Sequence, residues 1–224
     1  MAKKSFAMDT TSLSTEKPLL DNGVYAGIIC NASTKVGQND TIEIIKEKKW
    51  NKNTRTSEET GNYIIGGRLQ YGVTLTSKKA AKVLQRDEPR VFGGQIYANF
   101  DEDFRLADSH ILGQFLQALG LHGVNFSEVA LSQWEYDDNI EVPEELASVP
   151  NIIDMLNSVA YHRVFFDVIA NSVNGLPVLA KVVKQPNYKT PEVLENVLDM
   201  GTRNAAFCGI LPYVDGAEND LDEE

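Results

Sequence analysis

Two pairs of glycines interrupt the segments of this chain that alternate most clearly between apolar and polar residues. One pair, at positions 66–67, lies within residues 63–76, and the other, at 93–94, lies within residues 90–100. Glycine inside a strand weakens regular pairing and typically marks a bulge, a bend or a close backbone approach. Because bulges and glycine kinks are what curve a sheet, these pairs predict strongly bent antiparallel strands that close toward a barrel.

The remaining segments supply further strands and a few helices. Alternating apolar residues predict strands at residues 24–30, 41–50, 63–76, 90–100, 163–170 and 176–184, with a hairpin turn at 171–175. Helical spacing predicts a helix at 111–119 that ends at Gly120, and further helices are expected at 142–156, with a break at Pro150, and at 191–200. Residues 51–62 predict a polar loop, and residues 77–87 suit either a short helix or a basic loop.

This order of elements predicts a mainly β fold of the α+β class. An OB-like Greek-key antiparallel barrel with added helices accommodates a helix before the closing hairpin, and a β-sandwich is the main alternative. We expect a flexible arm at residues 1–18, an OB-like domain at 19–214 with a helical acidic insert at about 101–160, and a disordered acidic tail at 215–224. A repeat of fixed period does not occur, which excludes solenoids and propellers.

The sequence also bears on the compartment. Cys30 and Cys208 are too few for a disulfide framework and fit a reducing environment. Lys3 and Lys4 are not followed by an apolar stretch, so a secretory signal is not expected, and no apolar run approaches the ~20 residues that span a membrane. These features predict a cytoplasmic protein without membrane contact.

Charge is distributed unevenly along the chain. The net charge is −11, and six of the carboxylates lie in the last ten residues. Residues 43–90 hold eleven Lys and Arg against six Asp and Glu, whereas residues 101–154 hold twelve acids against Arg105 alone. One basic segment in an otherwise acidic protein indicates a surface that binds a polyanion.

The basic segment interleaves cations with aromatic residues, the combination with which single-strand binders neutralise phosphates and stack on bases. The alternative is that the tyrosines belong to the core and that the lysines are an ordinary solvated face that protects an edge strand. The candidate nucleic-acid-binding residues are Lys46, Lys48, Lys49, Trp50, Lys52, Arg55, Tyr63, Arg68, Tyr71, Lys78, Lys79, Lys82, Arg86 and Arg90.

Catalytic motifs are not found. The glycine pairs lie inside strands rather than before helices, so they do not form a phosphate-binding loop. His110, His122 and His162 have no Cys or His at the spacing of a zinc site. We therefore expect a protein that is not an enzyme and that holds no cofactor or metal.

These features together resemble bacteriophage single-stranded DNA-binding proteins of the OB-fold type. The resemblance rests on the Leu-x-x-Gly-Val-Tyr-x-Gly opening at residues 20–27, the glycine-kinked strands, the basic aromatic segment and the acidic tail. It implies non-catalytic, largely sequence-independent binding of single-stranded DNA in phage replication, recombination or repair, in the host cytoplasm. By this resemblance Trp50, Tyr63 and Tyr71 stack on bases, and Arg68 and the cations of residues 46–55 bind phosphates.

The acidic tail takes a second role by the same resemblance, in which it contacts replication or recombination proteins. Family tails commonly end in an aromatic residue, whereas this one ends in two glutamates, which favours an electrostatic gate over a docking peptide. A tail of this composition mimics nucleic acid toward its own basic site. The tail residues concerned are Asp215, Glu218, Asp220, Asp222, Glu223 and Glu224.

Two other functions remain open from the sequence. The chain fits a phage structural or virion-associated assembly protein if the acidic stretch at 101–154 is an assembly surface. It fits a metal-dependent nuclease if the carboxylates at 101–103 and 137–138 position a divalent cation. DNA or RNA preference, site size and oligomeric state do not follow from the sequence.

Overall fold

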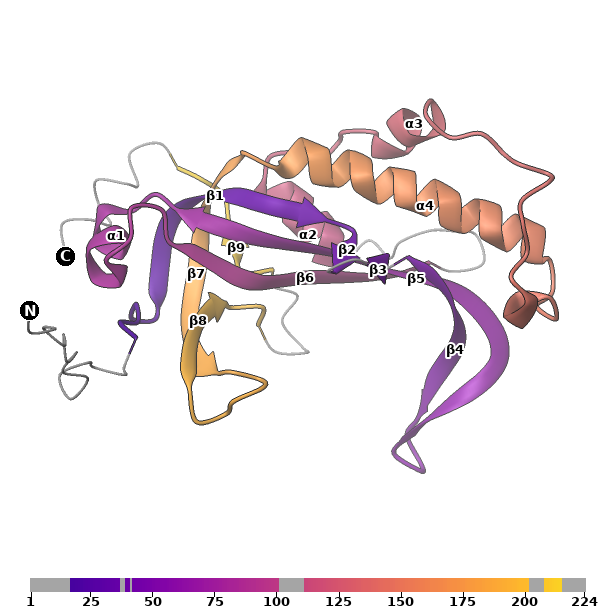
Figure 1. Cartoon of the computed structure of the whole chain (residues 1–224), viewed down its shortest axis with the longest axis horizontal. Coiled ribbons are helices and arrows are strands. Elements are labelled where there is room, and N and C mark those ends of the chain that lie inside the picture. Colours follow the sequence, from indigo (N-terminus) through magenta and orange to yellow (C-terminus); the bar gives the residue numbers. More distant parts are fainter. Residues whose placement is uncertain (1–16, 37–38, 41, 101–110, 202–207, 215–224) are drawn as a thin grey trace, which may run out of the picture.

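The computed structural model describes residues 17–36, 39–40, 42–100, 111–201 and 208–214 (Figure 1). The strands are β1 Gly23–Ser33, β2 Lys35–Val36, β3 Asn39–Asp40, β4 Glu43–Asn51, β5 Thr56–Leu75, β6 Arg90–Phe100, β7 Pro177–Pro186, β8 Leu194–Leu198 and β9 Ile210–Leu211. The helices are α1 Lys78–Leu84, α2 Ile111–Ala118, α3 Phe126–Leu131, α4 Ile152–Val173 and the short 3-10 helix η1 Glu144–Leu146. The protein is thus a mixed α/β chain with one dominant sheet, which agrees with the predicted class at that level.

Five strands of the sheet pair in a closed circuit. β1 pairs antiparallel with both β5 and β7, β5 pairs antiparallel with β6, and β7 pairs antiparallel with β8. The circuit is completed by a parallel contact between β6 and β8 at Phe92 and Val197. β4 adds to β5 outside the circuit, and β9 adds to β7. Strands distant in sequence therefore enclose one core, which includes Leu69, Tyr71 and Ile96.

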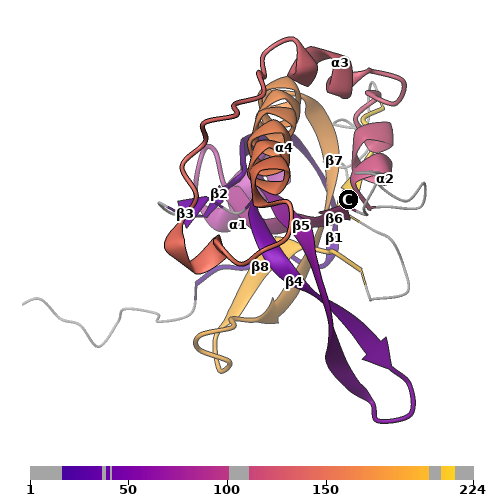
Figure 2. The same cartoon turned by 90° about the vertical axis from the view of Figure 1, so that its right-hand side faces the viewer.

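Strand β5 is longer than the sequence predicts. The loop expected at residues 51–62 is wrong over most of its length, because β5 already begins at Thr56 and only a four-residue turn separates it from β4. The strand forms because Trp50 and Lys48 of β4 lie opposite Ser57 and Glu59 in an antiparallel ladder. Polar residues thus build a two-stranded hairpin that projects from the body (Figures 1 and 2).

Helix α4 replaces two predicted elements. Residues 163–170 are not a strand and 171–175 are not a hairpin turn, because the chain is helical from Ile152 to Val173. Phe166, Ile169 and Val173 are buried at helical spacing, so packing against the core overrides a local sequence rich in β-branched and aromatic residues. The helix expected at 142–156 is formed only in part, as η1 and the first turn of α4 on either side of Pro150.

The helix expected at 191–200 is also wrong, because this segment forms β8. Leu198 pairs with Val182 of β7 and Val197 pairs with Val183, which places β8 beside β7 in the circuit of strands. Sheet pairing therefore outweighs the helix-starting preference of Pro191. Other expectations are confirmed: α2 ends before Gly120, which has a φ of +71°, and Ser77 caps α1, so the helical alternative for residues 77–87 applies.

Helices α3 and α4 lie on the side of the molecule opposite to the projecting hairpin (Figure 1). Phe126 and Ala130 of α3 are buried, and Phe166 of α4 reaches the core between the helices and the sheet. Among the described helices, none combines the length and the apolar character that crossing a bilayer requires.

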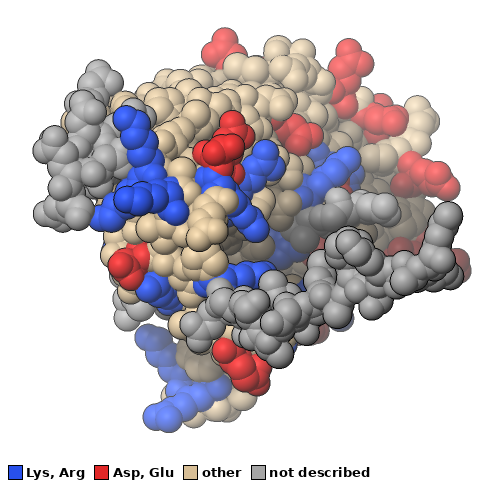
Figure 3. Space-filling model, turned by 60° about the vertical axis from the view of Figure 1, so that its left-hand side comes forward, with Lys and Arg blue, Asp and Glu red and all other residues tan. Residues whose placement is uncertain are grey.

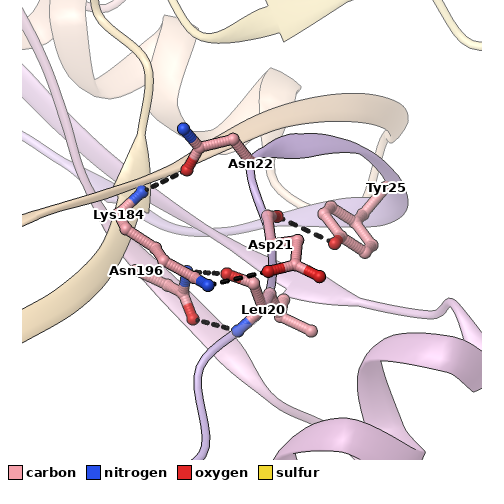
Figure 4. Close-up of polar contacts among 6 residues, drawn as sticks. All are labelled: Leu20, Asp21, Asn22, Tyr25, Lys184 and Asn196. Carbon is pink, nitrogen blue, oxygen red and sulfur yellow. Dashed lines mark hydrogen bonds and ion pairs between the residues drawn. The ribbon is translucent and has the colours of Figure 1, made fainter.

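The opening motif at residues 20–27 has a structural role. Figure 4 shows Leu20 bound to the side chain of Asn196 in β8: its amide donates to Oδ1 at 2.8 Å and its carbonyl accepts from Nδ2 at 3.0 Å. Tyr25 donates its hydroxyl proton to the Asp21 carbonyl at 2.9 Å, and Lys184 Nζ lies 2.7 Å from the Asp21 carboxylate. The hydrogen bond and charge of Lys184 lower the pKa of Asp21. These contacts fasten the start of β1 to the β7–β8 hairpin.

Candidate nucleic-acid interface

One face of β5 points away from the core. Leu69, Tyr71 and Val73 are buried, so the alternating residues Arg68 and Gln70 lie on the opposite face, which we call the outer face. Neither β5 from residue 66 onward nor β6 through residue 97 contains Asp or Glu. These parts of the two strands therefore carry no carboxylate that would repel a polyanion.

A glycine bulge in β6 brings two aromatic residues onto this face. In a regular strand Phe92 and Gln95 would point to opposite sides, because they are three residues apart. The ladder between β5 and β6 shifts register here, and Gly93 adopts a φ of +117°, which glycine tolerates. Phe92 is consequently 52% exposed and Tyr97 is 57% exposed on the same side of the sheet as Gln95.

The result is a set of directly opposed pairs across β5 and β6. We call these residues the outer-face patch. The pairs are Arg68 with Tyr97, Gln70 with Gln95, Gly72 with Phe92, and Thr74 with Arg90.

The Tyr97 ring is held by polar neighbours. Its hydroxyl donates to Gln95 Oε1 at 2.9 Å, and Arg68 Nη1 donates to the hydroxyl at 3.5 Å. The Arg68 guanidinium carbon lies 6.0 Å from the ring centroid, within the range of a cation–π contact. A planar cation and an exposed ring are thus positioned together, as stacking on a base and contact with a phosphate require.

The Phe92 ring covers a glycine of the neighbouring strand. A Cβ added at Gly72 would lie 3.0 Å from the Phe92 ring, so the ring lies against a residue that has no side chain. Cys30 of β1 pairs with the same glycine and is partly exposed. The outer-face patch therefore extends onto β1 without meeting a charged side chain at this position.

The prediction that Tyr71 stacks on bases is wrong, because its side chain is only 2% exposed. Its ring packs against Phe115 with centroids 4.6 Å apart, and its hydroxyl donates to the Cys208 carbonyl. Burial raises the pKa of Tyr71 well above its ordinary value. Tyr71 is a core residue, as the alternative interpretation of the sequence allowed.

The β4–β5 hairpin carries the predicted aromatic cation run, but much of its charge is balanced. Lys46 and Lys48 Nζ lie 3.4 and 3.8 Å from Glu59, and Lys49 lies 3.3 Å from Glu47. A hydrogen bond from Thr60 and, less strongly, the Lys49 ammonium lower the pKa of Glu47. Residues 43–65 hold five bases against four acids, so the hairpin has little net charge.

Exposed residues at the end of the hairpin remain available to a ligand. Trp50 is 62% exposed, and Lys52 and Arg55 lie exposed in the adjoining turn. Tyr63, farther along β5, is only partly exposed. The aromatic and cationic contacts with a ligand that the sequence predicts for this hairpin are therefore expected at its tip rather than along its stem.

The other predicted cations lie at the opposite end of β5. Lys78, Lys79 and Lys82 are exposed on α1, and Arg86 follows it. Residues 66–90 hold six bases against two acids, so this half carries most of the charge excess. Figure 1 places α1 and the hairpin at opposite ends of the sheet, and Figure 3 shows Lys and Arg spread over one side of the molecule. The predicted residues thus form a line along β5 rather than one cluster.

Sequence reasoning missed the aromatic residues of this line. Phe92 and Tyr97 lie in a predicted strand, but only recognition of the bulge at Gly93 would have placed both outside the core. It also missed Tyr188, which is 82% exposed in the β7–β8 turn, with Lys189 Nζ 5.3 Å from its ring centroid. The β7–β8 and β4–β5 hairpins project to the same side of the molecule in both views (Figures 1 and 2).

Carboxylates in the described part of the chain do not form a metal site. A group of three or more His, Cys, Asp or Glu side chains suited to a metal is not found among the described residues. The Asp137 carboxylate accepts from the Asn139 amide at 2.8 Å, which is a turn contact. Residues 101–103 and the tail at 215–224 lie outside the described residues.

Comparison of the chain with protein-family models, with curated proteins and with solved structures finds no match.

Proposed function

We propose that this protein binds single-stranded DNA without catalysis and largely without sequence preference, in phage replication, recombination or repair. The observation that carries the proposal is the outer-face patch, in which Phe92 and Tyr97 are exposed on the same face as Arg68, in parts of β5 and β6 that contain no Asp or Glu. Stacking is tolerant of sequence because every base has a flat face. Arg68 and Arg90 supply phosphate contacts next to the rings.

We further propose that the domain is an OB-type barrel. An OB-fold is a five-stranded Greek-key barrel that binds oligonucleotides on its second and third strands and on two flanking loops. The circuit of β1, β5, β6, β7 and β8 supports this assignment, with α2, α3 and α4 between the third and fourth strands of the circuit. In this scheme β5 and β6 are the second and third strands, so the outer-face patch occupies the expected binding face.

The two flanking loops correspond to the projecting hairpins. Trp50 at the end of β4 and Tyr188 in the β7–β8 turn are exposed aromatic residues, each with a lysine nearby. Side chains of this type extend a stacking surface beyond the sheet. Lys52 and Arg55 at one end and the lysines of α1 at the other add phosphate contacts along the line of β5.

The acidic tail is proposed to regulate this interface. Its six carboxylates compete with DNA phosphates for the cations along β5, with a strength that falls as salt rises. We also propose that the tail contacts replication or recombination proteins of the host or phage. Deletion of residues 215–224 is therefore expected to raise affinity for oligo-dT at low salt.

Titration of the full chain with oligo-dT tests the proposal. The titration is followed by tryptophan emission at about 50 mM salt, where phosphate contacts are strong. We expect quenching that is lost in Trp50→Phe, a variant that retains Trp134 as the background emitter. The same titration with the tail-deleted chain is the second measurement. Absence of binding by both the full chain and the tail-deleted chain in a gel shift at this salt would refute the proposal.

A further inference from the structure

Exposed apolar side chains lie on the side of the molecule away from both projecting hairpins. Val124, Val129 and Leu131 are exposed on and beside α3, and Tyr136 is exposed in the segment that follows. Figures 1 and 2 place α3 above the sheet, whereas the hairpins project below it. We call these four residues the α3 surface. Four large exposed apolar side chains within a short stretch are more than isolated surface residues require.

This surface is held in a defined shape. Asn157 of α4 is buried, accepts from the Asp137 amide at 2.8 Å and donates to the Asp137 carbonyl at 3.0 Å. Tyr136 donates its hydroxyl proton to Asp154 at 2.7 Å, and this bond raises the pKa of Tyr136 to about 12. The Trp134 ring packs edge-on against Tyr136, with centroids 6.3 Å apart. Because the segment is fastened to α4, the α3 surface is preorganised for a partner.

The sequence that contains the α3 surface is acidic. Residues 121–154 contain eight acids and no Lys or Arg. The ion pairs found among the described residues involve none of these carboxylates. The eight acids are Glu128, Glu135, Asp137, Asp138, Glu141, Glu144, Glu145 and Asp154. Glu128 lies in α3, Glu135, Asp137 and Asp138 flank Tyr136, and Asp154 accepts from Tyr136, so these five form the acidic rim of the α3 surface. An apolar centre with such a rim fits a segment that combines apolar anchors with positive charge.

The chain itself contains a segment of this chemistry. Residues 3–8 read Lys-Lys-Ser-Phe-Ala-Met and include two cations, an aromatic ring and a flexible thioether, without an acid. Phe6 and Met8 suit contact with Leu131 and aromatic neighbours, because methionine sulfur packs favourably against rings. We propose that residues 3–8 of one copy bind the α3 surface of a second copy.

The placement of the two partners favours a contact between copies. The indigo start of the described chain lies at the left of Figure 1, whereas α4 begins at the right. The segment between Lys3 and Lys17 extends to at most about 50 Å at roughly 3.5 Å per residue, long enough to reach a neighbouring molecule. A head-to-tail contact of this kind generates a ring if the rotation between copies closes and an open chain if it does not. The contact between residues 3–8 and the α3 surface does not involve the outer-face patch.

Sedimentation velocity of the full chain over a range of concentrations at about 50 mM salt tests this contact. We expect association beyond a dimer in the wild type. Deletion of residues 1–16 and, separately, Leu131→Lys should each weaken it at least tenfold. Val193→Lys is the matched control, because Val193 is equally exposed but lies in the β7–β8 hairpin. The double variant Glu135→Lys and Asp138→Lys reverses two charges beside Tyr136 without touching the apolar centre and should act like Leu131→Lys.

A mixing experiment identifies the contact. The arm-deleted chain retains the α3 surface, and the Leu131→Lys chain retains the arm, so their mixture should form a 1:1 complex that does not grow further. Circular dichroism of each variant confirms that it is folded. Equal masses for the full and arm-deleted chains at every concentration, or a mixture that forms no complex, would overturn the inference. Neither result depends on DNA, so the proposed function stands or fails separately.

Discussion

Replacement of Tyr97 tests whether the outer-face patch binds bases. The ring is 57% exposed, and it is oriented by Gln95 and Arg68 through its hydroxyl. Stacking of one base on an aromatic ring contributes about 1–3 kcal/mol, and each ~1.4 kcal/mol is tenfold in affinity. Tyr97→Ala should therefore raise the Kd for oligo-dT by about 5- to 140-fold. The free energy of unfolding should change by less than about 0.5 kcal/mol for such an exposed side chain.

Two comparisons separate stacking from other effects. Tyr97→Phe retains the ring but loses the hydroxyl, so its Kd should rise by less than the roughly fivefold lower limit for stacking. Tyr136→Ala removes another exposed tyrosine on the opposite side of the molecule and should leave the Kd unchanged. Fluorescence anisotropy with end-labelled oligo-dT at one fixed salt concentration measures all three variants. If Tyr97→Ala binds as tightly as the wild type while folded, bases do not stack on β6 and the reasoning is refuted.

Two further predictions concern stability. Gly94→Ala places a Cβ 2.4 Å from the Tyr71 ring in the core, so this overpacking should lower the free energy of unfolding in urea by about 1–3 kcal/mol; an unchanged midpoint would contradict the proposed packing. Burial lowers the pKa of His162, despite the Ser158 carbonyl 2.6 Å from Nδ1. Because the unfolded chain takes up a proton below the ordinary value of 6.5 and the folded chain resists it, stability should fall as pH drops below 6.5. His162→Gln should flatten that dependence in urea titrations between pH 8 and 5, and an equal slope in both proteins would exclude His162 as its source.

The cations of the candidate site were predicted only in part from the sequence. The excess of cations in residues 43–90 was visible in the sequence, and Arg68 and Arg90 do lie on the outer face. The sequence did not show that Lys46, Lys48 and Lys49 lie beside Glu59 and Glu47, because cross-strand neighbours depend on register. Register also decided that Tyr71 is buried while Tyr97 is exposed. A one-residue bulge reverses which face a side chain occupies.

Local sequence alone determined the elements whose pattern and packing agree. Residues 24–30, 90–100 and 176–184 alternate and form strands, and residues 111–118 have helical spacing and form α2, because each buries one face against the same core. The glycines at 93 and 94 were expected to bend a strand, and the positive φ of Gly93 confirms a special backbone there.

Only the tertiary structure decided the elements whose local preference conflicts with their surroundings. Residues 163–170 have β-branched and aromatic side chains typical of a strand, yet they are helical because α4 buries Phe166 and Ile169 against the sheet. Residues 194–198 follow a helix-starting proline, yet they form β8 because β7 and β6 offer backbone partners on both sides. Burial against the sheet and strand pairing depend on residues that are distant in sequence, so patterns within a short segment do not reveal them. The sequence by itself therefore determined a curved, strand-rich protein with a basic segment, whereas tertiary pairing decided which aromatic residues face solvent beside those cations.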